Sequence, residues 1–181
     1  EEHMDFYGTY GIAFSKSWGI NKGIQPIHYI NKHSILCADF SNAFNIAINE
    51  EKDDAATNFL LTQMYYMKPI EGTMPREGEN IKKNFTDECE WRFIPDVALI
   101  NLPQAVTDNE IACLGVLNKT ISENEKCWLK FNYDDVKYII LQTDDDVEKL
   151  CKVIERVGKD NIVKRKLISR IITWDNVKEN F

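Results

Sequence analysis

Hydrophobic and polar positions change period several times along the chain, and the first half of the pattern predicts two short strands followed by two helices. Residues 10–15 (YGIAFS) read as a strand, and a turn punctuated by glycines leads to a second short strand at 27–30. Ser34 is placed to cap the first helix, and Asp53 or Asp54 opens the second. Apolar residues recur there every three or four positions, which predicts that both stripes belong to the core: Leu36, Phe40, Phe44, Ala47 and Ile48, then Ala56, Phe59, Leu60, Met64 and Met67.

The middle of the chain is more polar. Residues 67–72 resume extended structure, and the run 71–84, rich in glycine and charge, predicts a mobile loop that could hold a functional lid. Residues 89–94 alternate enough to form a strand. Thr107 and Glu110 form a capping box ahead of a short helix through Leu114 and Leu117.

The last third predicts strands at 128–131, 136–141 and 167–173. Thr143 and the acidic run 144–146 begin a helix that Gly158 ends, and Thr173 caps a closing turn through Trp174 and Val177. One face of that helix is apolar: Val147, Leu150, Cys151, Ile154 and Val157. Together the elements predict a mixed α+β fold, a single domain over residues 1–181 with a mostly antiparallel, split sheet flanked by helices.

Composition narrows the class of protein. The chain has 181 residues, of which 44% are hydrophobic, and its apolar runs are far shorter than the roughly 20 residues that span a bilayer, so we expect no membrane segment. The five cysteines are scattered, with no CxxC pair that would suggest zinc or redox chemistry. We interpret them as reduced thiols of a cytoplasmic protein. His28 and His33 are five residues apart around a strand end, so we assign them surface or packing roles.

Charge gives one further constraint. There are 22 Lys and Arg against 29 Asp and Glu, a net charge of −7, which makes nucleic acid an unlikely main partner. One basic cluster could still bind an acidic partner or a nucleic acid. It consists of Lys159, Lys164, Arg165, Lys166 and Arg170. The favoured interpretation is that these residues belong to a solvated turn and the exposed face of a strand.

The common phosphate-loop, dinucleotide, nucleophile-elbow and zinc-protease motifs are absent from the sequence, but two segments are rich in chemically useful residues. In the first, His3, Tyr7 and Tyr10 precede a strand, an arrangement suited to a planar ring and a sugar hydroxyl, or equally to an aromatic entry into the core. In the second, strand alternation puts Glu88, Glu90 and Arg92 on one face. That face is either an ordinary edge pattern or a site for a sugar-phosphate ligand.

Several sequence blocks resemble the AbiGi family, described as the antitoxin half of the AbiG abortive phage-resistance system. The blocks are YGTYGIAFSKSWG from Tyr7, MKPIEG from Met67, ECEWRFIP from Glu88 and IITWD from Ile171. The resemblance implies a role in phage defence with a cognate toxin partner that is nucleotidyltransferase-like. Family members carry an apolar segment ahead of the His and Tyr block that this chain lacks, so we expect part of the first sheet or site to lie outside it.

The same order of blocks is similar to that of other prokaryotic defence families linked to an ADP-ribosyltransferase-like fold. That likeness implies NAD as cofactor, with His3 binding a ribose hydroxyl and Tyr7 or Tyr10 stacking on nicotinamide. It also implies that Glu90 stabilises the cationic ribose, that Glu88 orients the acceptor and that Arg92 faces phosphate. We favour a defence protein that works by regulation or interaction, because no complete catalytic motif is present. An NAD-dependent enzyme is the alternative. A DNA-binding regulator using the basic cluster lacks helix-turn-helix spacing.

Overall fold

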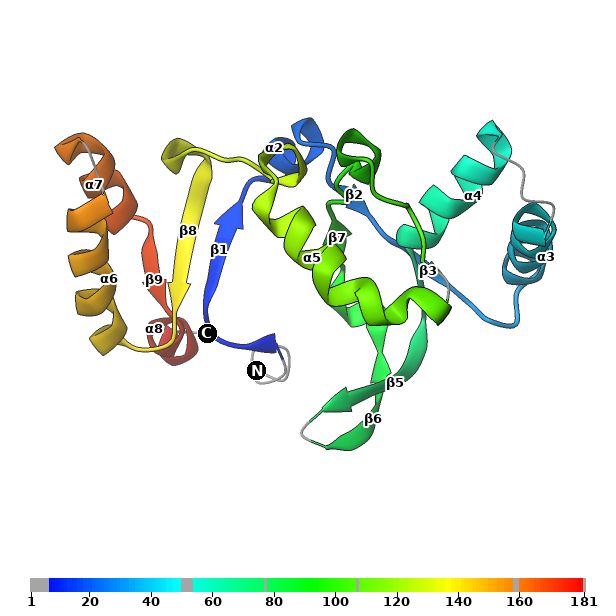
Figure 1. Cartoon of the computed structure of the whole chain (residues 1–181). Coiled ribbons are helices and arrows are strands. Elements are labelled where there is room, and N and C mark those ends of the chain that lie inside the picture. Colours follow the sequence, from blue (N-terminus) through cyan, green and yellow to red (C-terminus); the bar gives the residue numbers. More distant parts are fainter. Residues whose placement is uncertain (1–6, 50–53, 77, 107, 158–159, 181) are drawn as a thin grey trace. The chain divides into compact units, whose positions relative to one another are not determined.

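The computed structural model describes residues 7–49, 54–76, 78–106, 108–157 and 160–180. The chain forms two compact units (Figure 1). The terminal unit comprises residues 1–23 and 130–181, and the central unit comprises residues 24–129. Both contain helices and small sheets, which confirms the mixed α+β class. Each unit is described by itself below.

The terminal unit is built on a three-stranded sheet in the order β1-β8-β9, where β1 and β8 are antiparallel and β8 and β9 are parallel. The strands are β1 (Gly11–Phe14), β8 (Val136–Leu141) and β9 (Ile171–Thr173). The helices are α2 (Lys16–Asn21), α6 (Asp144–Val157), α7 (Asn161–Ile168) and α8 (Trp174–Asn180), with a 3₁₀ turn at Tyr133–Asp135. The first strand, the strand at 136–141 and the closing turn are therefore confirmed as structured elements, the last as a helix.

The core of the terminal unit lies between β8, α6 and α7. Val136, Ile154 and Leu167 are buried together. Helix α6 begins as predicted: the Asp146 carboxylate accepts a hydrogen bond from the Thr143 hydroxyl at 2.9 Å and from its N–H at 3.4 Å. The residues at which we expected it to stop, including Gly158, lie outside the described part of the chain.

The expected strand at 167–173 is wrong over its first half, because α7 occupies residues 161–168 and only β9 is extended. The Asp160 carboxylate caps α7 by accepting from the Ile162 N–H at 2.9 Å. Val163 and Leu167 lie four residues apart and pack on the core together, a helical spacing that outweighs the local strand pattern.

The described residues of the central unit form three short strand pairs, three α-helices and several 3₁₀ turns (Figure 1). The strands are β2 (Gln25–Pro26), β3 (His28–Ile30), β4 (Met67–Pro69), β5 (Glu71–Arg76), β6 (Glu79–Asn84) and β7 (Trp91–Arg92). The helices are α3 (Ile35–Asn49), α4 (Ala55–Tyr65) and α5 (Leu114–Glu123), and the 3₁₀ turns are η1 (Phe85–Glu88), η2 (Val97–Ile100), η3 (Asp108–Cys113) and η4 (Glu125–Cys127). β2 pairs with β7 and β5 with β6, both antiparallel, whereas β3 and β4 are parallel.

Helices α3 and α4 begin where the sequence predicts. The Ser34 hydroxyl accepts from the Cys37 N–H at 3.2 Å, and the Asp54 carboxylate accepts from the Thr57 N–H at 2.8 Å. The prediction that their stripes are core is wrong, because no described residue of either helix is buried. The two helices pack on each other, so one part of each stripe is half-buried and the rest faces outward.

Two other predictions in the central part of the sequence are also corrected. The polar run 71–84 is not a loop but the β5–β6 hairpin, with Gly78 at φ +86° in its turn. Residues 128–131 form no strand. The Trp128 indole instead donates to the Ser122 carbonyl at 2.7 Å, and Phe131, in the terminal unit, meets the Phe14 ring edge-on. The expected cap pair Thr107 and Glu110 cannot be compared, because Thr107 lies outside the described residues and so does the Glu110 side chain; the helix behind it is α5.

Candidate functional site

A cluster of four charged side chains lies in the central unit, where β4, η1 and β7 meet. The Lys68 ammonium on β4 forms ion pairs with Glu88, at the end of η1, and with Glu90, whose carboxylate is 3.2 Å away. Arg92 on β7 holds the other oxygen of Glu90 at 2.7 and 2.8 Å. The structure therefore brings together Glu88, Glu90 and Arg92 as predicted, and adds a lysine that the prediction lacked.

The cluster does not arise from strand alternation. Glu88 ends a 3₁₀ turn, and Cys89 has the left-handed φ of +45° that reverses the chain before Glu90. Only Trp91 and Arg92 of the expected strand at 89–94 are extended. A tight turn thus turns both carboxylates toward Lys68.

Backbone groups fix the cluster to its surroundings. The Arg92 guanidinium also donates to the Tyr65 carbonyl at the end of α4. The Glu90 N–H donates to the Tyr29 hydroxyl at 2.9 Å, and the Glu90 carbonyl accepts from the Ile27 N–H at 3.1 Å. These hydrogen bonds therefore connect residues of β3, α4 and β7 at the charged cluster.

The cluster is half-buried, with side-chain exposures from 9% at Glu88 to 29% at Arg92. Burial by itself lowers the pKa of Lys68, but hydrogen bonds to Glu88 and Glu90 outweigh it, so the pKa is raised above its usual value. The Lys68 ammonium also lies 4.5 Å from the centre of the Phe85 ring. Two cations and two carboxylates balance each other here, which is typical of a structural crosslink.

Phe85 itself is packed tightly against the hairpin. A Cβ added to Gly72 on β5 would lie 2.7 Å from the Phe85 ring, closer than atoms in a packed interior allow. Only glycine fits at this position without a shift of the ring. The blocks around Lys68 and Glu90 therefore meet through packing as well as through charge.

The other predicted site residues are in the terminal unit. His3 lies outside the described residues. Tyr7 and Tyr10 are exposed, and the Tyr10 hydroxyl donates to the Asp146 carboxylate at 3.0 Å. That hydrogen bond raises the pKa of Tyr10 above its usual value. The roles that we expected for these residues on a planar ring stay a prediction.

The predicted basic cluster lies on and after α7. Three of its described side chains are engaged within the terminal unit: Lys164 donates to the Glu155 carbonyl, Lys166 pairs with Asp134 at 2.9 Å, and Arg170 donates to the Tyr133 carbonyl. These contacts favour the interpretation of a helix-stabilising surface over one for phosphate contacts. Lys159 lies outside the described residues.

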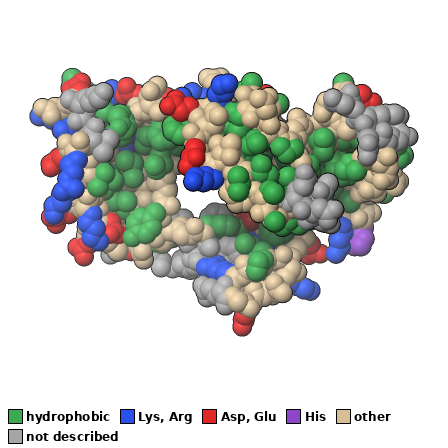
Figure 2. All heavy atoms as spheres, in the orientation of Figure 1, with side chains coloured by type: hydrophobic (Ala, Val, Ile, Leu, Met, Phe, Trp, Pro, Cys, Tyr) green, Lys and Arg blue, Asp and Glu red, His purple; other side chains and the backbone are tan. Residues whose placement is uncertain are grey.

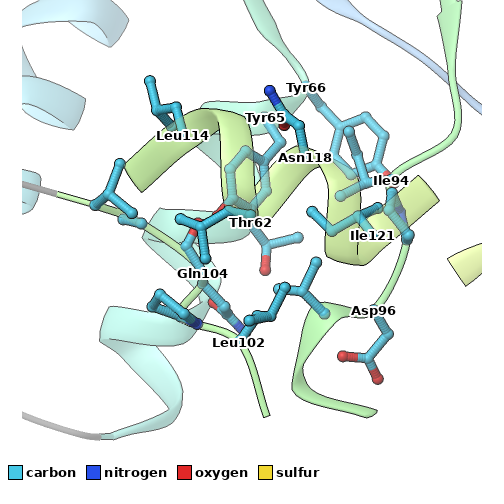
Figure 3. Close-up of a pocket in the computed structure, with 16 residues that line it drawn as sticks. Thr62, Tyr65, Tyr66, Ile94, Asp96, Leu102, Gln104, Leu114, Asn118 and Ile121 are labelled. Atoms are coloured by element: carbon cyan, nitrogen blue, oxygen red, sulfur yellow. The ribbon is translucent and has the colours of Figure 1, made fainter. Parts of the chain in front are cut away.

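A pocket of about 570 Å³ lies beside the cluster in the central unit (Figure 3). Its walls come from the end of α4, from the segments on either side of η2, and from α5. Tyr65 contacts both the charged cluster and the pocket, because its carbonyl accepts a hydrogen bond from Arg92 and its side chain lines the pocket. Sequence reasoning missed this pocket, since its walls are distant in the chain and carry no motif.

Comparison with known proteins identifies the family. A family model described as "Putative abortive phage resistance protein AbiGi, antitoxin" matches residues 1–142. The chain belongs to the AbiGi family. It is similar to the abortive phage resistance protein AbiGi of Lactococcus lactis subsp. cremoris, with 36% identity over 97% of this chain and 79% of that protein.

No solved structure matches the chain, so the ADP-ribosyltransferase-like fold gains no support from known structures. The AbiGi model covers the whole central unit, including the charged cluster and the pocket, whereas residues 143–181 lie beyond the matched region. Among the described residues, no helix is both long and apolar enough to cross a membrane.

Proposed function

We propose that this AbiGi-family chain acts in the cytoplasm as the antitoxin of a phage-defence pair, and that it binds a cognate nucleotidyltransferase-like toxin through helices α3 and α4. The observation that carries the proposal is the exposed apolar surface of these two helices. Ile35, Leu36 and Phe59 are 80%, 59% and 60% exposed. The two helices pack on each other, and apolar residues that gather on an exposed surface are typical of a protein interaction site.

Charge indicates what kind of partner fits. Helix α3 carries one charged residue, Asp39, and α4 carries none. The segment 50–54 that joins them is EEKDD, so residues 34–66 hold five acidic residues and one lysine. A partner surface with an apolar centre and a rim of Lys and Arg would complement this arrangement.

Co-expression with the neighbouring toxin gene tests the proposal. We expect the wild-type chain to restore growth and Phe59→Glu to reduce the restored colony count by more than about tenfold, because truncating or charging one central apolar contact costs about 2 kcal/mol or more of binding. Ile162→Glu is the matched control, since Ile162 is 63% exposed on α7 of the terminal unit.

Two results would contradict the proposal. Growth that is no better with the wild-type chain than without it removes the antitoxin function. Full rescue by Phe59→Glu and by Leu36→Glu removes helices α3 and α4 as the binding surface. Binding of the purified pair should also weaken as salt rises, because the complementary charges lie on the rim.

The alternative function is an NAD-dependent ADP-ribosyltransferase that uses Glu90. The charged cluster gives it less support, because one oxygen of Glu90 accepts from Arg92 and the other from Lys68. A catalytic carboxylate must have an oxygen to offer a developing cationic sugar. Calorimetric titration with NAD decides the matter: heat with the wild type that disappears in Glu90→Ala would favour the enzyme, and no heat with either would count against it.

A further inference from the structure

The pocket of the central unit has the size and shape of a small-molecule site. Its volume of about 570 Å³ falls within the roughly 300–1,000 Å³ that is common for ligand pockets. Figure 3 shows the side chains of Leu114, Asn118 and Ile121 of α5 around the pocket, together with Thr62 and Tyr65 of α4. Figure 2 shows hydrophobic side chains gathered at the surface over α5.

The lining excludes one large class of ligand. Among the residues that the structure describes, the pocket lining includes no Lys, Arg or His, and Asp96 is its one charged side chain. A phosphate or carboxylate placed here would lose its hydration without gaining a cation. Any ligand that fits is therefore uncharged or weakly cationic.

The pocket walls also indicate that the ligand is flat and partly polar. Tyr65 and Tyr66 contribute rings, and the remaining apolar lining is supplied by Ile94, Pro95, Val97, Leu102, Leu117 and Ile121, among others. The Tyr65 hydroxyl already donates to the Gln104 carbonyl. Rings fixed in this way present faces on which a planar ligand can stack.

Three uncharged polar side chains complete the lining. Thr62, Gln104 and Asn118 each have a hydroxyl or an amide that can both donate and accept. Within the described part of the chain, the side chains of Thr62 and Asn118 make no hydrogen bond. They are thus available to pair with the polar edge of a ring.

We propose that this pocket binds an uncharged, nucleoside-sized ring compound, with the ring against the tyrosines and its polar edge on Thr62 and Asn118. The proposal goes beyond the antitoxin function, because it concerns a small ligand and a pocket apart from Leu36 and Phe59. Arg92 is a positioning residue for the site: its hydrogen bond to the Tyr65 carbonyl fixes the end of α4.

Calorimetric titration of the full chain tests the proposal, with adenosine, guanosine, cytidine and uridine as probes, each paired with its 5′-monophosphate. We expect at least one nucleoside to bind, and its monophosphate to bind about tenfold more weakly or not at all, a difference of about 1.4 kcal/mol. Asn118→Leu should weaken binding by about tenfold, because one polar edge of the ligand loses its partner.

A second pair of variants locates the ligand. Ala105→Trp fills the pocket and should abolish binding, whereas Ala98→Trp adds the same side chain to a residue outside the lining and should leave binding unchanged. Circular dichroism checks that both variants are folded. Amide shifts in an NMR titration should change for residues of α5 in the wild type and not in Ala105→Trp.

Several results would overturn the proposal. It fails if none of the four nucleosides binds, if the monophosphates bind more tightly than the nucleosides, or if Ala105→Trp binds as the wild type does. It also fails if Ala105→Trp abolishes toxin binding while no nucleoside binds, because the pocket would then hold a side chain of the protein partner. Growth rescue by the wild type does not depend on any of these results, so the two proposals can fail separately.

Discussion

In the terminal unit, Ile154 is 5% exposed and packs with Val136 and Leu167 between one sheet and two helices. In the central unit, the elements around Glu90 are joined by ion pairs and by hydrogen bonds to backbone carbonyls, together with the packing of Phe85 on Gly72. The first arrangement resists change in shape, because a packed apolar core tolerates few alternatives. The second arrangement relies on charged side chains, and no described residue of α3 or α4 in the same unit is buried. The comparison thus places the apolar core of Val136, Ile154 and Leu167 in one unit, and the charged cluster with the proposed binding surfaces in the other.

The largest effect should come from opening the apolar core of the terminal unit. Ile154→Ala should lower the free energy of unfolding by about 2–4 kcal/mol, because it leaves a cavity beside Val136 and Leu167. Val153→Ala is the matched control, since Val153 is half-exposed on the same helix, and it should cost less than about 0.5 kcal/mol. Urea unfolding and amide hydrogen exchange each measure the free energy of unfolding of the two variants. Equal losses for the two variants would contradict a core at this place.

A smaller effect should come from the charged cluster of the central unit. Glu88→Gln and Lys68→Met should each lower the free energy of unfolding by about 1–3 kcal/mol, because each leaves a half-buried charge poorly paired. The double variant should cost less than the sum of the two, by about 1 kcal/mol.

Glu123→Gln serves as the control for this pair of variants. Its partner Lys119 is at 3.8 Å and both side chains are exposed, so we expect a change of less than about 0.5 kcal/mol. Strict additivity of Glu88→Gln and Lys68→Met would show that the cluster does not hold the central unit together.

The smallest effect concerns pH and the terminal unit. Hydrogen bonds from Lys149, Thr143 and Tyr10 lower the pKa of Asp146 from 3.8 to about 2. Because the folded pKa is the lower one, the stabilisation is present above the usual pKa near 3.8 and is lost as the pH falls through about 2.

We therefore expect Asp146→Asn to remove part of the loss of stability between pH 4 and pH 2. Asp145→Asn, which deletes a charge from the adjacent position, should retain it. Urea midpoints at pH 5 and pH 2.5 give the comparison, and an NMR titration of the Asp146 carboxyl carbon gives the pKa directly. If the pH profile of Asp146→Asn matched that of the wild type, Asp146 would not contribute to the loss of stability at low pH.

The sequence predicted best those features that depend on near neighbours. Ser34 and Asp54 cap the helices that they were expected to cap, because a cap and the N–H groups that it serves lie within three residues. Thr143 lies at the start of α6 as expected, with its hydroxyl and its N–H donating to Asp146. The class of fold, the strand at 136–141 and the coming together of Glu88, Glu90 and Arg92 are also confirmed. The cause expected for that grouping was wrong, since a left-handed turn at Cys89 and not strand alternation produces it.

The predictions that were wrong or incomplete concern features that depend on residues distant in the chain. The β5–β6 hairpin has few apolar residues, among them the paired Met74 and Ile81, so its sequence shows little of the hydrophobic alternation that marks a half-buried strand. Lys68 joins the cluster from twenty residues away, and no spacing rule connects it to Glu88. The stripes of α3 and α4 have the period of a buried helix, but burial requires a surface to pack on, which the sequence of one helix does not contain.

The parallel ladder between β3 and β4 has a consequence for how this family can vary. Ile30 pairs with Pro69, and His28 with Met67, so the chain leaves and returns at neighbouring points around residues 31–66. The entropy of closing such an excursion depends only weakly on its length. Helices α3 and α4 can therefore vary in length while β3 and β4 keep their places, provided that the Tyr65 carbonyl still accepts from Arg92 of the cluster. On the proposed binding through α3 and α4, chimaeras between AbiGi relatives, joined at Asn31 and Tyr66, should carry partner choice from one protein to another.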